Sequence, residues 1–150
     1  MSAPRSWLPG PAGVVILAGV AAALHRRLAA LAPDARERQQ PHALAHLGAV
    51  DTALGSARAV LQAAAAGIDA DPVRWGRLEA MRVRAHVEAV ASEVLDRVGR
   101  ALGAFPLCRD AGHARRVADL LVFLRQSHAE RDLAGLGAGM AGEGGTGWAL

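Results

Sequence analysis

Apolar residues at helical spacing, repeated in four separate segments, limit what this chain can fold into. Within each segment they recur every three or four positions, which gives a helix one apolar face. Proline, glycine or capping residues divide one segment from the next. Because each apolar face must be buried against another, the pattern predicts an all-α fold, an antiparallel up-down four-helix bundle. The expected helices are residues 12–31, 42–67, 72–101 and 111–136.

Local signals mark the ends of the last two helices. Asp71 is expected to cap the third helix at its start, with Pro72 as the first helical residue. Gly103 should end that helix as a C-cap. Asp110 is the expected N-cap of the fourth helix, and Gly137 should stop it.

The amino-acid composition agrees with a single helical domain. Alanine is abundant, and tyrosine and lysine are absent, so helix propensity is high along most of the chain. A length of 150 residues is enough for one domain with a real core. The glycine-rich end has no periodicity and too few apolar residues to pack. The predicted organisation is an N-terminal extension at 1–11, the bundle at 12–137 and a flexible tail at 138–150.

Charge and hydropathy argue against nucleic-acid and membrane partners. The sequence pI is about 10.8, but the formal net charge is only +3, and arginines alternate with acidic residues along the helices. The apolar run from Ala12 to Leu24 is too short to span a bilayer, which favours a buried helix over a membrane span or a signal peptide. The only cysteine, Cys108, cannot form an internal disulfide, so we expect a reducing, cytoplasmic setting.

Two histidines lie one helical turn apart at the start of the second segment. His42 and His46 could share a metal ion, but zinc needs three or four ligands. No cysteine or carboxylate lies at a suitable local spacing, and Asp51 is too far along the helix. We therefore expect no metal site here, and two solvent-facing or interface histidines.

The sequence leaves two different roles open for His128. It continues the helical spacing of Val117, Leu121 and Leu124, so its imidazole should lie on a buried face. Hydrogen-bonded to a neighbouring helix, it would be a core histidine. Shielded from water beside a substrate or cofactor, it could act as a general acid or base.

The loop before the second helix combines arginines with amide side chains. The mixed charges at 34–38 read most simply as a solvated connection with weak ion pairs. Arg38, followed by Gln39 and Gln40, also fits a phosphate clamp, because a guanidinium matches phosphate oxygens in a fork and amides add donors beside it.

Three stretches of the sequence resemble the C-terminal helical domain of the acyl-CoA dehydrogenase superfamily. They are LGAVDTALGSAR (47–58), DPVRW (71–75) and, above all, RRVADLLVFLRQSHAERDL (115–133). In that family a four-helix bundle packs against a β-rich middle domain and an N-terminal helical domain. It holds FAD or reduced flavin between them and builds the core of a tetramer.

The resemblance gives four candidate residues for contacts with the cofactor. Gln126 and Ser127 occupy the place of the family's short flavin-contacting turn. Arg36 or Arg38 matches an arginine that reaches the phosphates of the cofactor.

The resemblance also implies a role for His128. Family members that abstract a proton beside the thioester commonly have a glutamate where this chain has Arg125 or Gln126, and neither of these can be that base. A histidine at the position of His128 is similar to the branch of flavin-dependent monooxygenases, where such a ring lies near the reactive edge of the isoalloxazine.

The implied function is therefore part of a flavin-dependent oxidoreductase. The chain would be the C-terminal portion of an acyl-CoA dehydrogenase-type enzyme, acting on the CH–CH group of acyl-CoA-like donors with FAD or reduced FMN. A monooxygenase component of the same fold is the alternative. A separate chain carrying the N-terminal and middle domains would complete it, and a homo-oligomer, dimer or tetramer, is expected. The second hypothesis belongs to a different functional class: a non-catalytic helical oligomerisation module.

Overall fold

Every regular element that the structure describes is a helix. The computed structural model describes residues 19, 22–26, 29–30, 33, 40–71, 75–126 and 128–142. These residues contain no β-strand, so the predicted all-α class is confirmed. In the same part of the chain, no helix is both long and apolar enough to cross a bilayer. The elements are α3 (Pro41–Ala70), α4 (Arg77–Leu102), α5 (Phe105–Arg109), α6 (Ala111–Leu124) and α7 (Ala129–Gly142).

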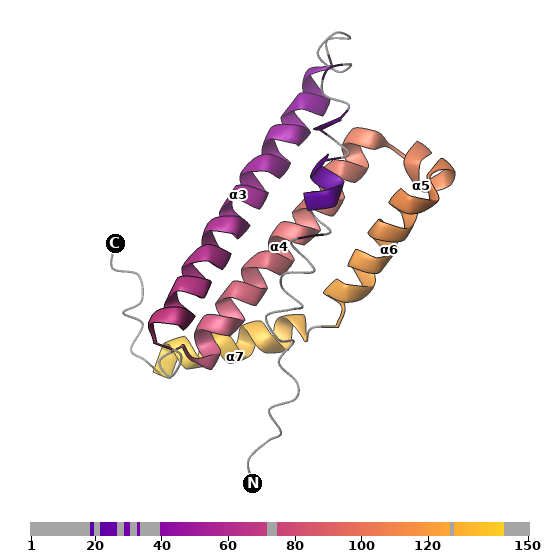
Figure 1. Ribbon diagram of the computed structural model, residues 1–150. Coiled ribbons are helices and arrows are strands. Elements are labelled where there is room, and N and C mark those ends of the chain that lie inside the picture. Colours follow the sequence, from indigo (N-terminus) through magenta and orange to yellow (C-terminus); the bar gives the residue numbers. More distant parts are fainter. Residues whose placement is uncertain are drawn as a thin grey trace.

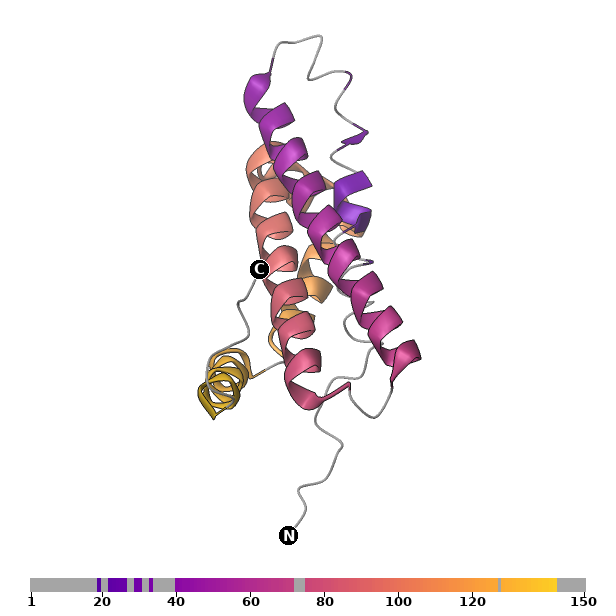
Figure 2. The same ribbon diagram turned by 90° about the vertical axis from the view of Figure 1, so that its left-hand side faces the viewer.

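A hairpin of two long helices, α3 and α4, forms the centre of the fold. They run antiparallel and side by side in both views (Figures 1 and 2). The buried face of α3 is made mostly of alanine, which lets the two backbones approach closely, and that of α4 is made mostly of valine. The core residues that the hairpin contributes are Val50, Ala53, Ala57, Val87, Val90, Ala91, Val94 and Val98.

Two further segments close this core. Helix α6 runs antiparallel to α4 (Figure 1). It inserts Leu120, which is 1% exposed, into the core. The helical residues 22–26 contribute Leu24, which has no exposed surface. Most of the expected helix 12–31, and the whole extension 1–11, lie outside the described residues.

Two of the four capping predictions are confirmed. Gly103 ends α4 with a left-handed φ of 65°, a conformation that glycine adopts without steric cost, and its N–H bonds to the Gly99 carbonyl oxygen. The side chain of Asp110 accepts a hydrogen bond of 2.8 Å from the backbone N–H of His113, which caps α6.

The start of α4 differs from the prediction. Helix α4 begins at Arg77, after Gly76, and not at Pro72, which lies outside the described residues. Asp71 instead follows the end of α3, where its N–H bonds to the Gly67 carbonyl oxygen. Helix α3 continues through Gly67 to Ala70, three residues beyond the expected end, although glycine and aspartate are poor helix formers.

The predicted single helix 111–136 is wrong, because the structure divides it in two. Helix α6 ends at Leu124, and α7 crosses the lower end of the hairpin. Its axis lies across the view in Figure 1 and is seen end-on in Figure 2. Glycines at the crossing allow the close approach. A Cβ at Gly135 would lie 3.3 Å from Cε of Met81, and one at Gly139 would lie 2.6 Å from Cδ2 of Leu78. Helix α7 continues to Gly142, into the region expected to be a tail.

Candidate functional site

His128 does not lie on a buried face. The structure places it exposed, between the end of α6 and the start of α7. The prediction of a buried imidazole is wrong for two reasons. The buried face of α6 is centred on Leu120, so that Leu121 is 41% exposed, and the helix ends before it reaches His128.

The turn that carries His128 is held by short-range backbone bonds. The N–H groups of Arg125 and Gln126 donate to the carbonyl oxygens of Val122 and Phe123, in the tight pattern of a 3₁₀ turn. The N–H of His128 donates to Oδ2 of Asp132 at 3.4 Å, which caps the start of α7. The side chain of Gln126 is exposed, and Ser127 lies outside the described residues.

The exposed position of His128 limits what it can do in this chain alone. General acid–base catalysis by an imidazole needs a substrate held within hydrogen-bond reach and protected from bulk water. The described residues around His128 provide backbone capping but no such shield.

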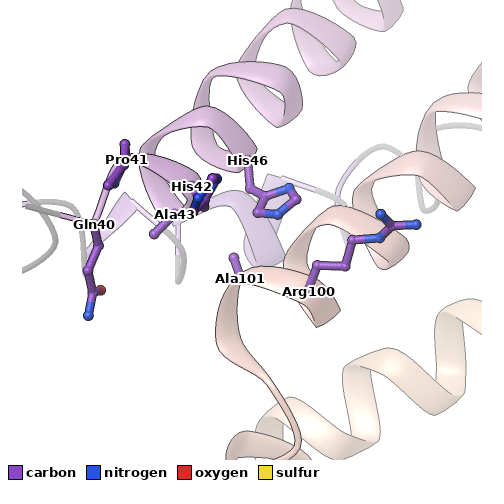
Figure 3. A pocket seen from close by; sticks show the side chains of 7 residues that line it. All are labelled: Gln40, Pro41, His42, Ala43, His46, Arg100 and Ala101. Atoms are coloured by element: carbon purple, nitrogen blue, oxygen red, sulfur yellow. The ribbon is translucent and has the colours of Figure 1, made fainter.

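A pocket lies at the other end of the hairpin, beside the segment predicted to contact phosphate. Arg36 and Arg38 lie outside the described residues, and the described chain resumes at Gln40. Gln40 lines a pocket of about 370 Å³ between the start of α3 and the end of α4 (Figure 3). The lining residues are Gln40, Pro41, His42, Ala43, His46, Arg100 and Ala101.

The polar groups of this pocket are mostly hydrogen-bond donors or basic. None of the lining residues is acidic, and the first turn of α3 has neither an acidic residue nor a side-chain cap. The ring of His46 lies between the two helices (Figure 3), and its Nδ1 is buried without a hydrogen-bond partner among the described residues. Such an open helix start attracts anions, because its N–H groups are unpaired and the helix dipole is positive there.

Arg100 supplies a cation at the edge of the pocket. Its Nε lies 2.9 Å from Oδ2 of Asp96, one turn earlier on α4. The Arg100 side chain is 66% exposed, so this ion pair is weak and can be exchanged for another anion. These groups together can hold an oxyanion such as a phosphate.

A metal site has no support in the described residues. They contain no group of three or more histidine, cysteine, aspartate or glutamate side chains that could hold an ion. The pair His42 and His46 lines the pocket together with Arg100, whose positive charge disfavours a cation.

One serine–histidine pair joins α3 to α4, but it lacks the arrangement of a nucleophile and its base. Oγ of Ser56 lies 3.2 Å from Nε2 of His86 and 2.7 Å from the Ala53 carbonyl oxygen. A serine hydroxyl has one hydrogen, which is donated to that carbonyl, so His86 must be the donor in the other contact. A general base would have to accept the serine proton instead. The pair therefore links the two helices.

Among the described residues, the pocket beside Gln40 and the turn of His128 lie apart. The pocket beside Gln40 lies at the end of the hairpin where α3 begins, and the turn of His128 lies toward the opposite end (Figures 1 and 2). The turn follows α6, whose 14 residues span about 21 Å. A ligand held in the pocket would have to be about that long to reach the turn of the same copy.

Arg100 was not identified from the sequence. It is about 55 residues from His46 along the chain, and only the antiparallel hairpin brings the end of α4 to the start of α3. Matching the end of one predicted helix with the start of the preceding one would have suggested this neighbour.

Comparison with known proteins gives no match for this chain. No protein-family model, no curated protein and no solved structure is significantly similar to it.

Proposed function

We propose that this chain is the helical C-terminal portion of an acyl-CoA dehydrogenase-type flavin oxidoreductase. In this proposal the expected helix 12–31 joins α3, α4 and α6 to complete an antiparallel four-helix bundle. The pocket beside Gln40 takes the phosphates of FAD or reduced FMN, with Arg36 or Arg38 contributing from the preceding loop. The turn at Gln126, Ser127 and His128 faces the flavin ring.

The observation that supports the proposal most is the chemistry of the pocket. The orphaned Nδ1 of His46, the uncapped start of α3 and the exchangeable cation of Arg100 fit an oxyanion. The fit covers the phosphate part of a flavin nucleotide. The exposed residues Gln126 and His128 do not enclose a ring by themselves.

In this proposal the pocket and the turn that meet one flavin come from different copies. A flavin whose phosphates lie in the pocket then meets His128 of a second copy. We therefore propose a cytoplasmic homo-oligomer, a dimer or a tetramer, together with a separate chain that supplies the N-terminal and middle domains. When bound, the flavin would supply the redox chemistry, and this chain would bind its phosphates and orient its ring.

Two reactions are compatible with the proposal, dehydrogenation and monooxygenation. Dehydrogenation of an acyl-CoA-like donor needs a base, and Arg125 and Gln126 offer no carboxylate at the expected position. A partner chain would have to supply it. A monooxygenase component is the second version, in which His128 donates a hydrogen bond near the flavin.

The test is flavin binding by the full chain, alone and mixed with candidate chains that carry the other domains. We expect stoichiometric binding of FAD or FMN in at least one mixture, read from the visible spectrum. Arg100→Ala should weaken binding about tenfold, because one phosphate contact is lost. Arg97→Ala is the matched control, because Arg97 forms a similar pair with Glu93 outside the pocket. Absence of flavin from every mixture, or equal effects of both variants, contradicts the proposal.

A second candidate is a non-catalytic helical oligomerisation module. Large apolar side chains exposed on α5 and α6 favour it, in particular Phe105 (73% exposed) and Val122 (62% exposed). This candidate predicts a colourless oligomer in which His128→Ala changes stability only. Loss of flavin-dependent turnover in His128→Ala, with an unchanged melting temperature, would rule it out.

A further inference from the structure

We propose that two copies of this chain exchange α7. In the exchanged dimer, α6 and α7 of each copy straighten into one long helix, and each α7 packs on α4 of the other copy. The bent arrangement seen in Figure 1 is then the closed monomer. The proposal concerns an interaction between copies and requires no flavin.

The connection between α6 and α7 favours a helix in its sequence. No glycine or proline lies between Gly112 and Gly135, and the connection Arg-Gln-Ser-His contains two strong helix formers. The backbone of Arg125 has φ −85° and ψ 0°, a turn conformation that ends α6. Local preference and the observed bend therefore disagree.

The surface that receives α7 is complementary to α7 itself. Gly135 packs against Met81, and Gly139 against Leu78, so only a helix with small residues four apart can come this close. The guanidinium of Arg82 also contacts the sulfur of Met140. A second copy carries an identical α7 and can reproduce every one of these contacts. This identifies the partner as another copy of the chain.

Straightening would also gather apolar side chains that the bend leaves exposed. Val122 on α6 is 62% exposed, and Leu133 on α7 is 54% exposed. In one continuous helix Val122, Leu133 and Leu136 fall at i, i+11 and i+14, which is a single stripe. The two long helices of a dimer can bury these stripes against each other.

The bent form has its own stabilising contacts, so the balance depends on protein concentration. Asp132 caps the N–H of His128, and Glu130 and Asp132 lie in the first turn of α7, where a helix dipole favours acidic residues. A continuous helix loses this cap. Dimerisation must offset that loss, which makes the exchange a mass-action equilibrium.

The first experiment measures the mass of the full chain by light scattering after size exclusion, over a range of concentrations. We expect a shift from 15.5 kDa toward twice this value as concentration rises. Gln126→Ala should favour the straight helix and Gln126→Gly the bend. The two variants differ about fivefold in the helix–bend equilibrium of each connection, and a dimer has two connections, so their dimerisation constants should differ by roughly 25-fold. Ala and Gly at Gln62, exposed in the middle of α3, are the matched controls and should leave the constant unchanged.

The second experiment distinguishes exchange from any other dimer. In a Cys108→Ser background, one chain carries Leu78→Cys and the other carries Gly139→Cys, because a Cβ at residue 139 would lie 3.4 Å from Cγ of Leu78, within reach of a disulfide. After mixing at high concentration and mild oxidation, exchange predicts a covalent heterodimer, and Gln126→Gly in both chains should reduce its yield. A dimer by light scattering that gives no heterodimer, or a chain that stays monomeric at every concentration, overturns the proposal. Either result leaves the flavin-binding test unaffected.

Discussion

The α3–α4 hairpin and the α6–α7 arm begin from the same kind of sequence but reach different structures. Both have apolar residues at helical spacing and high helix propensity. Each helix of the hairpin is uninterrupted, and it buries its apolar face against the other helix over many turns. The arm buries Leu120 and then bends, which leaves Val122 and Leu133 exposed.

The difference teaches that helical spacing predicts a helix but not its partner. A helix persists as a straight element where packing continues along its length, because most helical stability in proteins comes from tertiary contacts. In the arm, glycines at Gly135 and Gly139 offer a different partner, the start of α4, which can be reached only across a bend.

The largest expected effect tests whether the hairpin carries the stability of the molecule. Arg84 of α4 is 7% exposed, and its Nη2 lies 2.6 Å from Oε1 of Glu88. Arg84→Met should destabilise the chain by about 3–5 kcal/mol in urea unfolding, because it leaves Glu88 buried and uncompensated. The double variant with Glu88→Leu should recover most of this loss.

The exposed pair Arg97 and Glu93 is the control for the single and double substitutions of Arg84 and Glu88. Its side chains are 39% and 45% exposed, so the corresponding substitutions should change stability by less than about 1 kcal/mol. A similar loss in both pairs would mean that burial within the hairpin is not the cause.

The next prediction compares the buried and the exposed face of α6. Leu120→Ala should cost about 2–5 kcal/mol, because it leaves a cavity between α6 and the hairpin. Val122→Ala should stay within about 0.5 kcal/mol in dilute protein, where its side chain is exposed. Thermal unfolding of both variants at low concentration measures the difference. Equal losses would show that α6 packs on another face.

The smallest effect concerns the helicity of α7. A Cβ added at Gly137 would have no neighbour within 4 Å, whereas one at Gly139 would meet Leu78. Gly137→Ala should strengthen α7 by about 0.5–1 kcal/mol, seen as a twofold to fivefold slowing of its amide exchange. Gly139→Ala should lose that gain, because the added methyl group must displace Leu78. If both variants slow exchange equally, α7 does not pack on α4 through this face.

The parts of the fold that could be predicted are those that local chemistry decides. Gly103 and Asp110 were predicted as caps because each role depends on one residue and its own backbone. The bend after Leu124 could not be predicted, because no glycine or proline marks it. Its cause is the docking of residues more than ten positions later onto α4.

The candidate site was predictable only in part for the same reason. Gln40 was predicted to lie in a phosphate clamp and His46 to be a solvent-facing or interface histidine, whereas Arg100 reaches them only through the hairpin. The prediction that His128 is buried assumed that α6 continues past Leu124. The helix ends there, and His128 is exposed. The roles of Arg36, Arg38, Gln126, Ser127 and His128 toward a flavin stay predictions.

Amide hydrogen exchange across the whole chain tests the contrast between hairpin and arm most directly. If the hairpin is the stable core and α7 opens separately, amides from Val87 to Val98 should exchange only on global unfolding. Those from Leu133 to Gly139 should exchange at least roughly a hundredfold faster, through local opening. Equal protection in the two helices, lost together under mild denaturant, would contradict the account, because α7 would then be part of one cooperative unit with the hairpin.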